Sequence, residues 1–302
     1  CLLGASKYRN LPAAGRAAAF WAAAALLGQA EAGAGTSAAA LEGAVAALLR
    51  RNPVLEAYRR GRIAEWTGPR WELDDRFVAL SLLVDQGEDA AGDRWAAKGE
   101  RYTSLEALLA GVDAPALVLL GPPGGGKSTI LRHLELSLSL RGLDDPTVPY
   151  TFFIQLNQYQ PARPGEALPA PGDWLAQRWA SRNPALPPLD GLLAEGRMLL
   201  LLDALNEMPA AGGAAGQARL VRLWKDWLLQ LAAERPGNRV VFSCRTLDYS
   251  APLSTAALRV PQVNVEGLDD EGVRRFLDSY SPERAAEIWE AISGTQQLEL
   301  LR

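Results

Sequence analysis

The chain has 302 residues, of which 48% are hydrophobic, and its 31 basic and 35 acidic side chains give a net charge of −4. This length allows one large domain or two unequal ones with a full-sized core. The mildly acidic balance argues against a nucleic-acid partner held by general phosphate attraction. Cys1 and Cys244 are too few for a disulfide scaffold or a zinc cluster, which favours a reduced, cytoplasmic location.

Residues 1–75 are predicted to be an N-terminal helical and linker region, and their sequence does not indicate a role. Residues 17–27 form an alanine-rich apolar run. A bilayer-spanning helix needs about 20 apolar residues, so we expect a soluble helix and no membrane partner. A second helix is expected at residues 38–50, ending before Pro53. Because the chain starts at Cys1 rather than at Met, we expect a segment of a longer protein.

A basic cluster lies at the end of this second predicted helix and beyond it. The simpler interpretation is a solvated helix face or an intramolecular partner for acidic loops. Contact with an acidic membrane or with nucleic acid is the alternative. The cluster consists of Arg50, Arg51, Arg59, Arg60 and Arg62.

A glycine-rich loop lies between a predicted strand and a predicted helix. Residues 116–120 are an apolar run typical of a buried strand, and residues 129–140 carry leucines at helical spacing. The eight residues between them fit G-x-x-x-x-G-K-[ST], the phosphate-binding loop signature, without a mismatch. An ordinary glycine-rich turn is the weaker interpretation in this context. The predicted nucleotide-binding residues are Gly121, Pro122, Pro123, Gly124, Gly125, Gly126, Lys127, Ser128 and Thr129.

The chemistry of this loop follows from its residue types. Backbone N–H groups and the positive end of the helix dipole converge on negative oxygens. The glycines let the backbone approach phosphate closely and adopt positive φ. Lys127 is expected to reach the β- and γ-phosphates, and the Ser128 hydroxyl is expected to ligate Mg²⁺.

A leucine-rich run leads to the acidic residues of the predicted site. After a strand at residues 150–156, a helix capped by Asp173 and a short helix at residues 189–195, residues 199–202 are four consecutive leucines. Such a run suits a strand buried on both faces. Asp203 follows it at the carboxyl end, where a carboxylate can serve Mg²⁺ opposite Ser128. Glu207 is the candidate for orienting and deprotonating the attacking water, and a surface carboxylate is its alternative.

A basic residue at the end of the next strand completes the predicted constellation. A long helix at residues 217–234 leads to a buried strand at residues 239–244. Arg245 follows directly and is expected to contact a γ-phosphate, with a structural salt bridge as its alternative. Cys244 is expected to be a small buried residue. Residues 260–265 suggest a fifth strand, placed at a sheet edge because of Pro261, and Asp269 is expected to cap the next helix.

With these residues assembled, the chain resembles the NACHT family of STAND nucleotide-switch NTPases. The resemblance rests on residues 121–129, 199–207, 240–245 and 266–270, and covers about residues 77–302. Where the family usually has an acidic residue just before the glutamate, this chain has Asn206. The resemblance implies a nucleotide-binding domain at residues 76–265 and the start of a truncated helical subdomain at residues 266–302.

The fold class that follows is α/β. It is a P-loop NTPase with a parallel five-stranded sheet flanked by helices, plus helical segments at both ends. The implied strand order is 5-1-4-3-2, from residues 260–265 through 116–120, 239–244 and 199–202 to 150–156. The resemblance also implies adenine contacts near Phe77 and Val78. It implies ATP or ADP with Mg²⁺ as cofactors, self-association on activation and a sensor region after residue 302.

Three functions compete at this point. The first is a signalling switch in bacterial defence or stress signalling, in which nucleotide exchange opens the protein and slow ATP hydrolysis resets it. The second is an energy-coupled ATPase of the wider AAA+ type, which needs sustained hydrolysis and an arginine from a neighbouring subunit. The third is a scaffold that no longer depends on nucleotide. The catalytic candidates for either ATPase are Lys127, Asp203, Glu207 and Arg245, and the metal candidates are Ser128 and Asp203.

Overall fold

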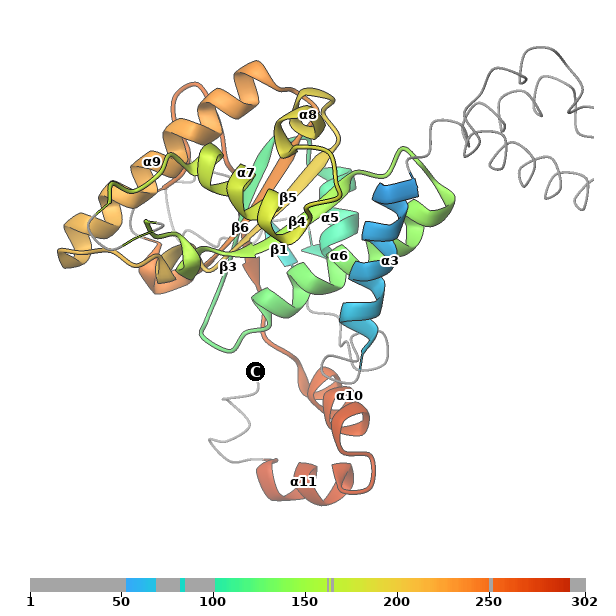
Figure 1. Ribbon diagram of the computed structural model, residues 1–302. Helices are drawn as coiled ribbons and strands as arrows, with labels where there is room; N and C mark the ends of the chain where they lie inside the picture. Colours follow the sequence, from blue (N-terminus) through green and yellow to red (C-terminus); the bar gives the residue numbers. More distant parts are fainter. Residues whose placement is uncertain are drawn as a thin grey trace, which may run out of the picture.

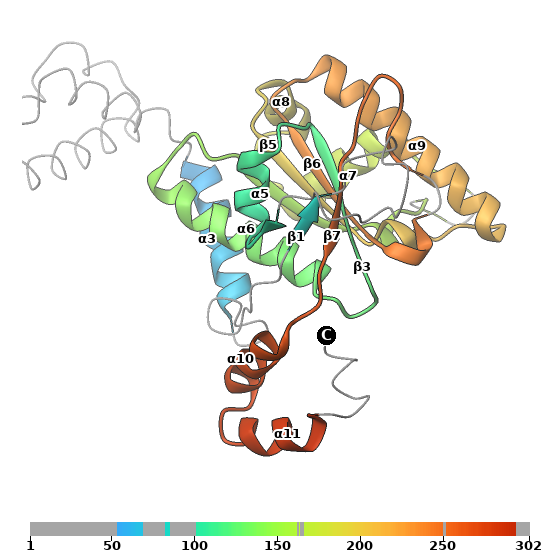
Figure 2. The same ribbon diagram turned by 180° about the vertical axis from the view of Figure 1, so that it is seen from behind.

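A seven-stranded sheet with helices on both faces forms the body of the protein (Figures 1 and 2). The computed structural model describes residues 53–68, 82–84, 101–161, 163, 166–249 and 252–293. The helices predicted at residues 17–27 and 38–50, and the adenine contacts expected near Phe77 and Val78, lie outside these residues. The strands are β1 (Leu82–Val84), β2 (Arg101–Tyr102), β3 (Ala116–Gly121), β4 (Tyr150–Gln155), β5 (Met198–Asp203), β6 (Arg239–Arg245) and β7 (Gln262–Val265).

The helices cover the sheet in two groups. The α-helices are α3 (Pro53–Thr67), α5 (Leu105–Gly111), α6 (Lys127–Asp144), α7 (Pro171–Arg182), α8 (Leu189–Ala194), α9 (Gly213–Glu234), α10 (Asp270–Tyr280) and α11 (Ala285–Ile292). Short 3₁₀ turns follow three strands: η3 (Leu156–Gln158), η4 (Leu205–Glu207) and η5 (Thr246–Asp248). Helices α7, α8 and α9 lie on one face of the sheet, and α5 and α6 lie on the other (Figure 1).

The sheet is larger than the predicted five strands. Its order is β2-β1-β7-β3-β6-β5-β4, and the five strands from β7 to β4 are parallel. These five strands follow the predicted order 5-1-4-3-2, and the full strand order differs from the prediction because β1 and β2 extend the sheet in antiparallel fashion beyond β7. The edge position expected for β7 is wrong. Pro261 precedes the strand, which begins at Gln262, so every residue of β7 keeps a backbone N–H for pairing.

The alternation of side chains along the strands builds two cores. In β5, Leu200 and Leu202 point toward α7, α8 and α9, whereas Leu199 and Leu201 point toward α5 and α6. Both sets are buried, since helices cover both faces of the sheet. Asp203 is the next residue of this strand, so burial of the leucines fixes its position at the carboxyl end.

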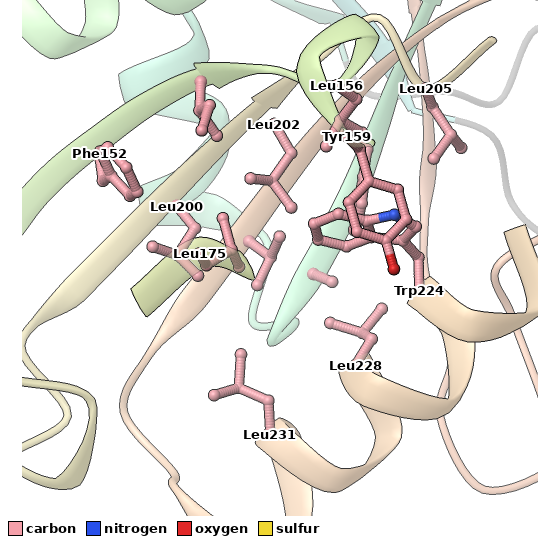
Figure 3. Close-up of a cluster of buried hydrophobic side chains, with 14 of the residues drawn as sticks. Phe152, Leu156, Tyr159, Leu175, Leu200, Leu202, Leu205, Trp224, Leu228 and Leu231 are labelled. Atoms are coloured by element: carbon pink, nitrogen blue, oxygen red, sulfur yellow. The ribbon is translucent and has the colours of Figure 1, made fainter. Parts of the chain in front are cut away.

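Aromatic rings fill the core under α9. Trp224 is completely buried, and its ring centroid lies 5.2 Å from that of Tyr159 and 6.1 Å from those of Trp174 and Phe242. Figure 3 shows Trp224 beside Tyr159 and above Leu228 and Leu231 of the same helix. These contacts confirm that the apolar stripe of α9 faces the sheet. The Trp224 Nε1–H has no hydrogen-bond partner among the described residues.

Helix α3 packs along α6 at the β4 end of the sheet, and it was not predicted from the sequence. The structure supports the intramolecular interpretation for one member of the basic cluster. Arg59 is buried, donates a hydrogen bond to the Val148 carbonyl and lies 4.3 Å from the centroid of the Tyr150 ring. Arg50 and Arg51 lie outside the described residues.

Side chains cover the outer edge of β4, which is the last strand of the sheet. The Tyr58 hydroxyl donates to the Thr151 carbonyl at 2.7 Å. The Phe153 N–H donates to Glu135 at 3.3 Å, and Arg182 donates to the Phe153 carbonyl at 3.3 Å. Helices α3, α6 and α7 each contribute one of these side chains, so the edge is closed by three separate elements.

Several helix boundaries differ from the predictions by a turn or less. Helix α7 begins at Pro171 after Ala170, so Asp173 lies in the first turn rather than at the cap. Pro171 supplies the favoured φ for a first helical residue, and this outweighs the aspartate signal. The cap expected at Asp269 is confirmed by a hydrogen bond from the Gly272 N–H, and Ser104 caps α5 by accepting a hydrogen bond from the Ala107 N–H.

Helices α10 and α11 lie at one end of the molecule, away from the sheet (Figure 2). They bury a small core of their own around Val273 and Leu277. Over the described part of the chain, no helix combines the length and apolar character that a membrane crossing needs.

We predict that Trp224→Ala lowers the free energy of unfolding by about 3–5 kcal/mol, because it leaves a cavity among four aromatic rings. Chemical denaturation followed by circular dichroism measures this change. Trp224→Phe is the matched control. It keeps most of the ring and removes a buried N–H without a partner, so its cost is expected to be much smaller. Equal losses for the two variants would contradict the packing role.

Candidate functional site

A cleft of about 250 Å³ opens at the carboxyl ends of β3, β5 and β6. Residues 123–129 of the glycine-rich loop and the start of α6 line one side. The other side is formed by Asp203, Ala204, Asn206 and Glu207 after β5, and by Ser243 and Arg245 of β6. The central strands of an open α/β sheet place ligand-binding groups at this position.

The glycine-rich loop has the backbone conformation that its sequence predicts. Gly124 and Gly126 have φ of 75° and 73°, in the left-handed region that favours glycine. A Cβ on Gly125 would lie 3.1 Å from atoms of Pro122, so this position is also restricted to a small residue. Gly126 is the N-cap of α6, which directs the N-terminus of that helix into the cleft. An anion placed there would meet free N–H groups and the positive helix end.

Lys127 is held by the backbone of the loop that precedes it. Its ammonium donates to the carbonyls of Gly121 at 2.8 Å and of Pro122 at 2.6 Å. Partial burial lowers its pKa, and the nearby Arg245 charge acts in the same direction. The side chain is therefore fixed in the cleft by two neutral acceptors rather than by an ion pair within hydrogen-bonding distance.

Asp203 is the buried centre of the site. Its side chain is 1% exposed, and Oδ1 accepts hydrogen bonds from the hydroxyls of Ser128 at 2.9 Å and Ser243 at 2.6 Å. Its second oxygen, Oδ2, is buried without a hydrogen-bond partner among the described residues. A buried carboxylate oxygen without a hydrogen bond lowers the stability of the fold unless a cation or a hydrogen-bond donor binds it.

These residues fit a magnesium ion bound together with phosphate. Asp203 and the Ser128 hydroxyl supply oxygen ligands from neighbouring elements, 2.9 Å apart. Within the described ranges, no three His, Cys, Asp or Glu side chains gather as a metal site. Mg²⁺ needs no such cluster, since it commonly uses one or two protein oxygens, waters and the phosphates of the substrate.

The turn after Asp203 is held in an unusual backbone conformation. Ala204 has φ of 61° and ψ of 59°, and it is the one non-glycine residue with positive φ among the described residues. Its N–H donates to the Ser243 hydroxyl at 2.8 Å. Ser243 therefore accepts from Ala204 and donates to Asp203, which fixes both the turn and the carboxylate.

Arg245 and Glu207 form an ion pair at the open side of the cleft. The Arg245 guanidinium donates to Glu207 Oε1 at 2.8 Å, and the side chains are 43% and 41% exposed. Asn206 lies between the two strand ends: its Oδ1 accepts from the Arg245 N–H at 3.2 Å, and its Nδ2 donates to Asp248 at 3.0 Å. An exposed ion pair of this kind contributes little to stability, so both groups can exchange partners at low cost.

Cys244 lies in β6 directly before Arg245 of the site. The thiol is buried against the core under α9, and burial raises its pKa to about 12. The expectation of a small buried residue rather than a reactive thiol is consistent with this environment.

The structure brings together the catalytic candidates Lys127, Asp203, Glu207 and Arg245 in one cleft. The structure also agrees with the alternative interpretations of two residues. Glu207 is an exposed carboxylate, and Arg245 makes a salt bridge with it. Sequence reasoning missed Ser243 and the contacts of Asn206. The available signal for Ser243 was a hydroxyl residue within the run 240–244, whose other members are all apolar.

Comparison with known sequences and structures gives one family. The sequence model of the NACHT domain matches residues 116–284. No curated protein matches the chain significantly. Among solved structures, a chain in the HORMA:CdnC:Trip13 complex of E. coli MS115-1 matches with 17% identity and a TM-score of 0.37. That match covers 55% of this chain and 52% of the other.

We predict that Ser243→Ala lowers the free energy of unfolding by about 1–3 kcal/mol, because it leaves the Ala204 N–H without its acceptor and Asp203 without a donor. Thermal and chemical denaturation of the purified chain measure the change. Ser243→Thr keeps the hydroxyl and is expected to recover part of the loss. If Ser243→Ala were as stable as the parent, the bridge between the two strands would have no energetic role.

Proposed function

The chain belongs to the NACHT domain family, the P-loop NTPases of the STAND type, and we propose that it is an ATP-binding signalling switch. In this proposal ADP holds a closed form, exchange for ATP opens it, and open protomers self-associate. Slow ATP hydrolysis then resets the switch. The observation that carries the proposal is the single cleft in which Lys127, Ser128, Asp203 and Arg245 face one another.

The glycine-rich loop is assigned to the phosphates. The N–H groups at the start of α6 would receive phosphate oxygens, and Gly124 and Gly126 already have the backbone angles that such a loop needs. Lys127 would exchange its two carbonyl acceptors for β- and γ-phosphate oxygens. This exchange is favourable because an ammonium binds an anionic oxygen more strongly than a neutral carbonyl.

Ser128 and Asp203 would hold Mg²⁺, which when bound neutralises charge on the phosphates. The buried Asp203 Oδ2 supports this assignment, since it is an acceptor left without a donor among the described residues. Ser243 is a positioning residue here. It keeps Oδ1 in place by a 2.6 Å hydrogen bond, so the carboxylate is oriented before any ligand arrives.

The Arg245–Glu207 pair is assigned to detection of the γ-phosphate. A γ-phosphate in the cleft would compete with Glu207 for the Arg245 guanidinium, since both are oxyanions. Release from Arg245 would leave Glu207 free to orient and deprotonate a water molecule. ADP lacks the competing group, so the ion pair would remain. The two nucleotides would thus favour different arrangements of the η4 and η5 turns.

The biological setting belongs to the proposal as well. Resemblance to bacterial members of the family suggests a cytoplasmic protein in defence or stress signalling, with a sensor region after residue 302. An energy-coupled ATPase of the AAA+ type is the alternative. It is less favoured because Arg245 lines the cleft of its own chain, whereas that class relies on an arginine from a neighbouring subunit. A scaffold independent of nucleotide is a third candidate.

We predict that Lys127→Ala lowers ATP affinity about tenfold to a hundredfold, because it removes the ammonium that contacts the β- and γ-phosphates. Isothermal titration calorimetry with Mg–ATP measures this loss. Lys225→Ala is the matched control, since Lys225 contacts the Pro252 carbonyl and does not line the cleft. ATP binding unchanged by Lys127→Ala would favour the scaffold, and turnover well above about one per second would favour the AAA+ alternative.

We predict that Arg245→Gln lowers the affinity for ATP about tenfold and leaves that for ADP nearly unchanged, because only ATP has the phosphate that Arg245 detects. Competition between the two nucleotides for a fluorescent analogue measures both affinities. Arg235→Gln, which breaks an ion pair with Asp190 outside the cleft, serves as the control. Equal losses for ATP and ADP would rule out γ-phosphate detection by Arg245.

A further inference from the structure

A second cavity, of about 540 Å³, lies between α3, α6, α7 and the β4 end of the sheet. Its lining shares no residue with the nucleotide cleft. The volume falls within the range of small-molecule sites. The lining differs from an ordinary apolar pocket in having three arginines from three different helices: Arg62 of α3, Arg132 of α6 and Arg182 of α7.

The described lining of this cavity contains more basic than acidic side chains. Among the described lining residues, Glu65 is the one carboxylate, and it pairs with Arg62 at 2.6 Å. Glu135 lies behind the wall, where it accepts hydrogen bonds from Trp66 Nε1 at 2.8 Å and from the Phe153 N–H. Burial raises the pKa of Glu135, and the Arg62 charge and the hydrogen bonds that Glu135 accepts act in the opposite direction. Among the described lining residues, three guanidinium groups therefore stand against one carboxylate.

Two further observations are consistent with an anionic ligand. The Nε of Arg62 is buried and has no hydrogen-bond partner among the described residues. Burial lowers the pKa of Arg182, and the charges of Arg178 and Arg62 lower it further. Arg182 lines the cavity and donates hydrogen bonds to the Phe153 carbonyl at 3.3 Å and to Gln158 Oε1 at 2.9 Å. A guanidinium fixed among like charges is a preformed oxyanion site.

The rest of the lining suits the organic part of a ligand. Trp66 and Phe153 supply ring surfaces that meet edge to face, with centroids 5.8 Å apart. Gln155, Gln158 and Asn183 bring amide groups that can both donate and accept hydrogen bonds. Rings, amides and guanidinium groups together suit a polar heterocycle or sugar that carries phosphate.

We propose that this cavity binds a phosphorylated small molecule of about the size of a nucleoside monophosphate, at a site separate from the P-loop. The arginines take the phosphate, and the rings and amides take the organic part. The site joins α3 to α6, the helix that begins at Lys127. The proposal does not depend on the switch, because its residues lie outside the nucleotide cleft.

The test uses the whole chain in the Lys127→Ala background, so that the P-loop site contributes little. Titration calorimetry with AMP and with inorganic phosphate is carried out on this protein and on two further variants. Arg182→Gln removes the guanidinium at the end of α7 but keeps an amide donor for the Phe153 carbonyl, and circular dichroism checks that the variant folds. Arg141→Gln is the matched control, because Arg141 lies on α6 but not in the cavity.

We expect AMP to bind, and its affinity to fall about tenfold to a hundredfold in Arg182→Gln while it stays unchanged in Arg141→Gln. Inorganic phosphate alone is expected to bind at least tenfold more weakly than AMP. Absence of AMP binding at millimolar concentration, or equal affinity in Arg182→Gln and Arg141→Gln, would overturn the proposal. Equal affinity for AMP and phosphate would overturn the part assigned to the rings and amides.

Discussion

The structure depends most on one buried carboxylate at the end of an entirely apolar strand. Burial of the leucines of β5 on both faces carries Asp203 into a position that water barely reaches. Two hydroxyls satisfy Oδ1, but the second oxygen has no donor among the described residues. Burial of this second oxygen costs free energy that the packing of the sheet offsets, and a bound cation would lower that cost. The glycine-rich loop and the turn after Asp203 line the cleft beside this carboxylate.

The nucleotide cleft was largely predictable, because its parts are set by short-range rules. Glycine residues at positions 124 and 126 predict a loop with positive φ angles, because glycine adopts them without strain. An apolar run followed by Asp203 predicts a carboxylate at the end of a buried strand. The partners of these residues were not predictable. Ser243 bridges Asp203 and Ala204 only because β5 and β6 align in one register, and a sequence does not state that alignment.

The periphery of the sheet was the least predictable part. The prediction placed β7 at an edge on the evidence of Pro261, but the strand starts one residue later and pairs on both sides. Strands β1 and β2 are short, with three and two residues, and such segments carry almost no periodic signal. Helix α3 begins at Pro53, a residue type that in the sequence predicts the end of the preceding helix. Its place against α6 follows from tertiary contacts such as Arg59 and Trp66.

The covering of β4 bears on how copies of this protein can associate. An edge strand that nothing covers has unpaired backbone N–H and C=O groups, which can pair with a strand of another chain and lead to cross-β aggregation. In β4, the side chains of Tyr58, Glu135 and Arg182 form hydrogen bonds with the outward-facing backbone groups of Thr151 and Phe153. Protomers therefore cannot join by continuing the sheet through β4 unless α3 and α7 move away. Helix α3 in this sense protects the colloidal stability of the domain as well as its fold.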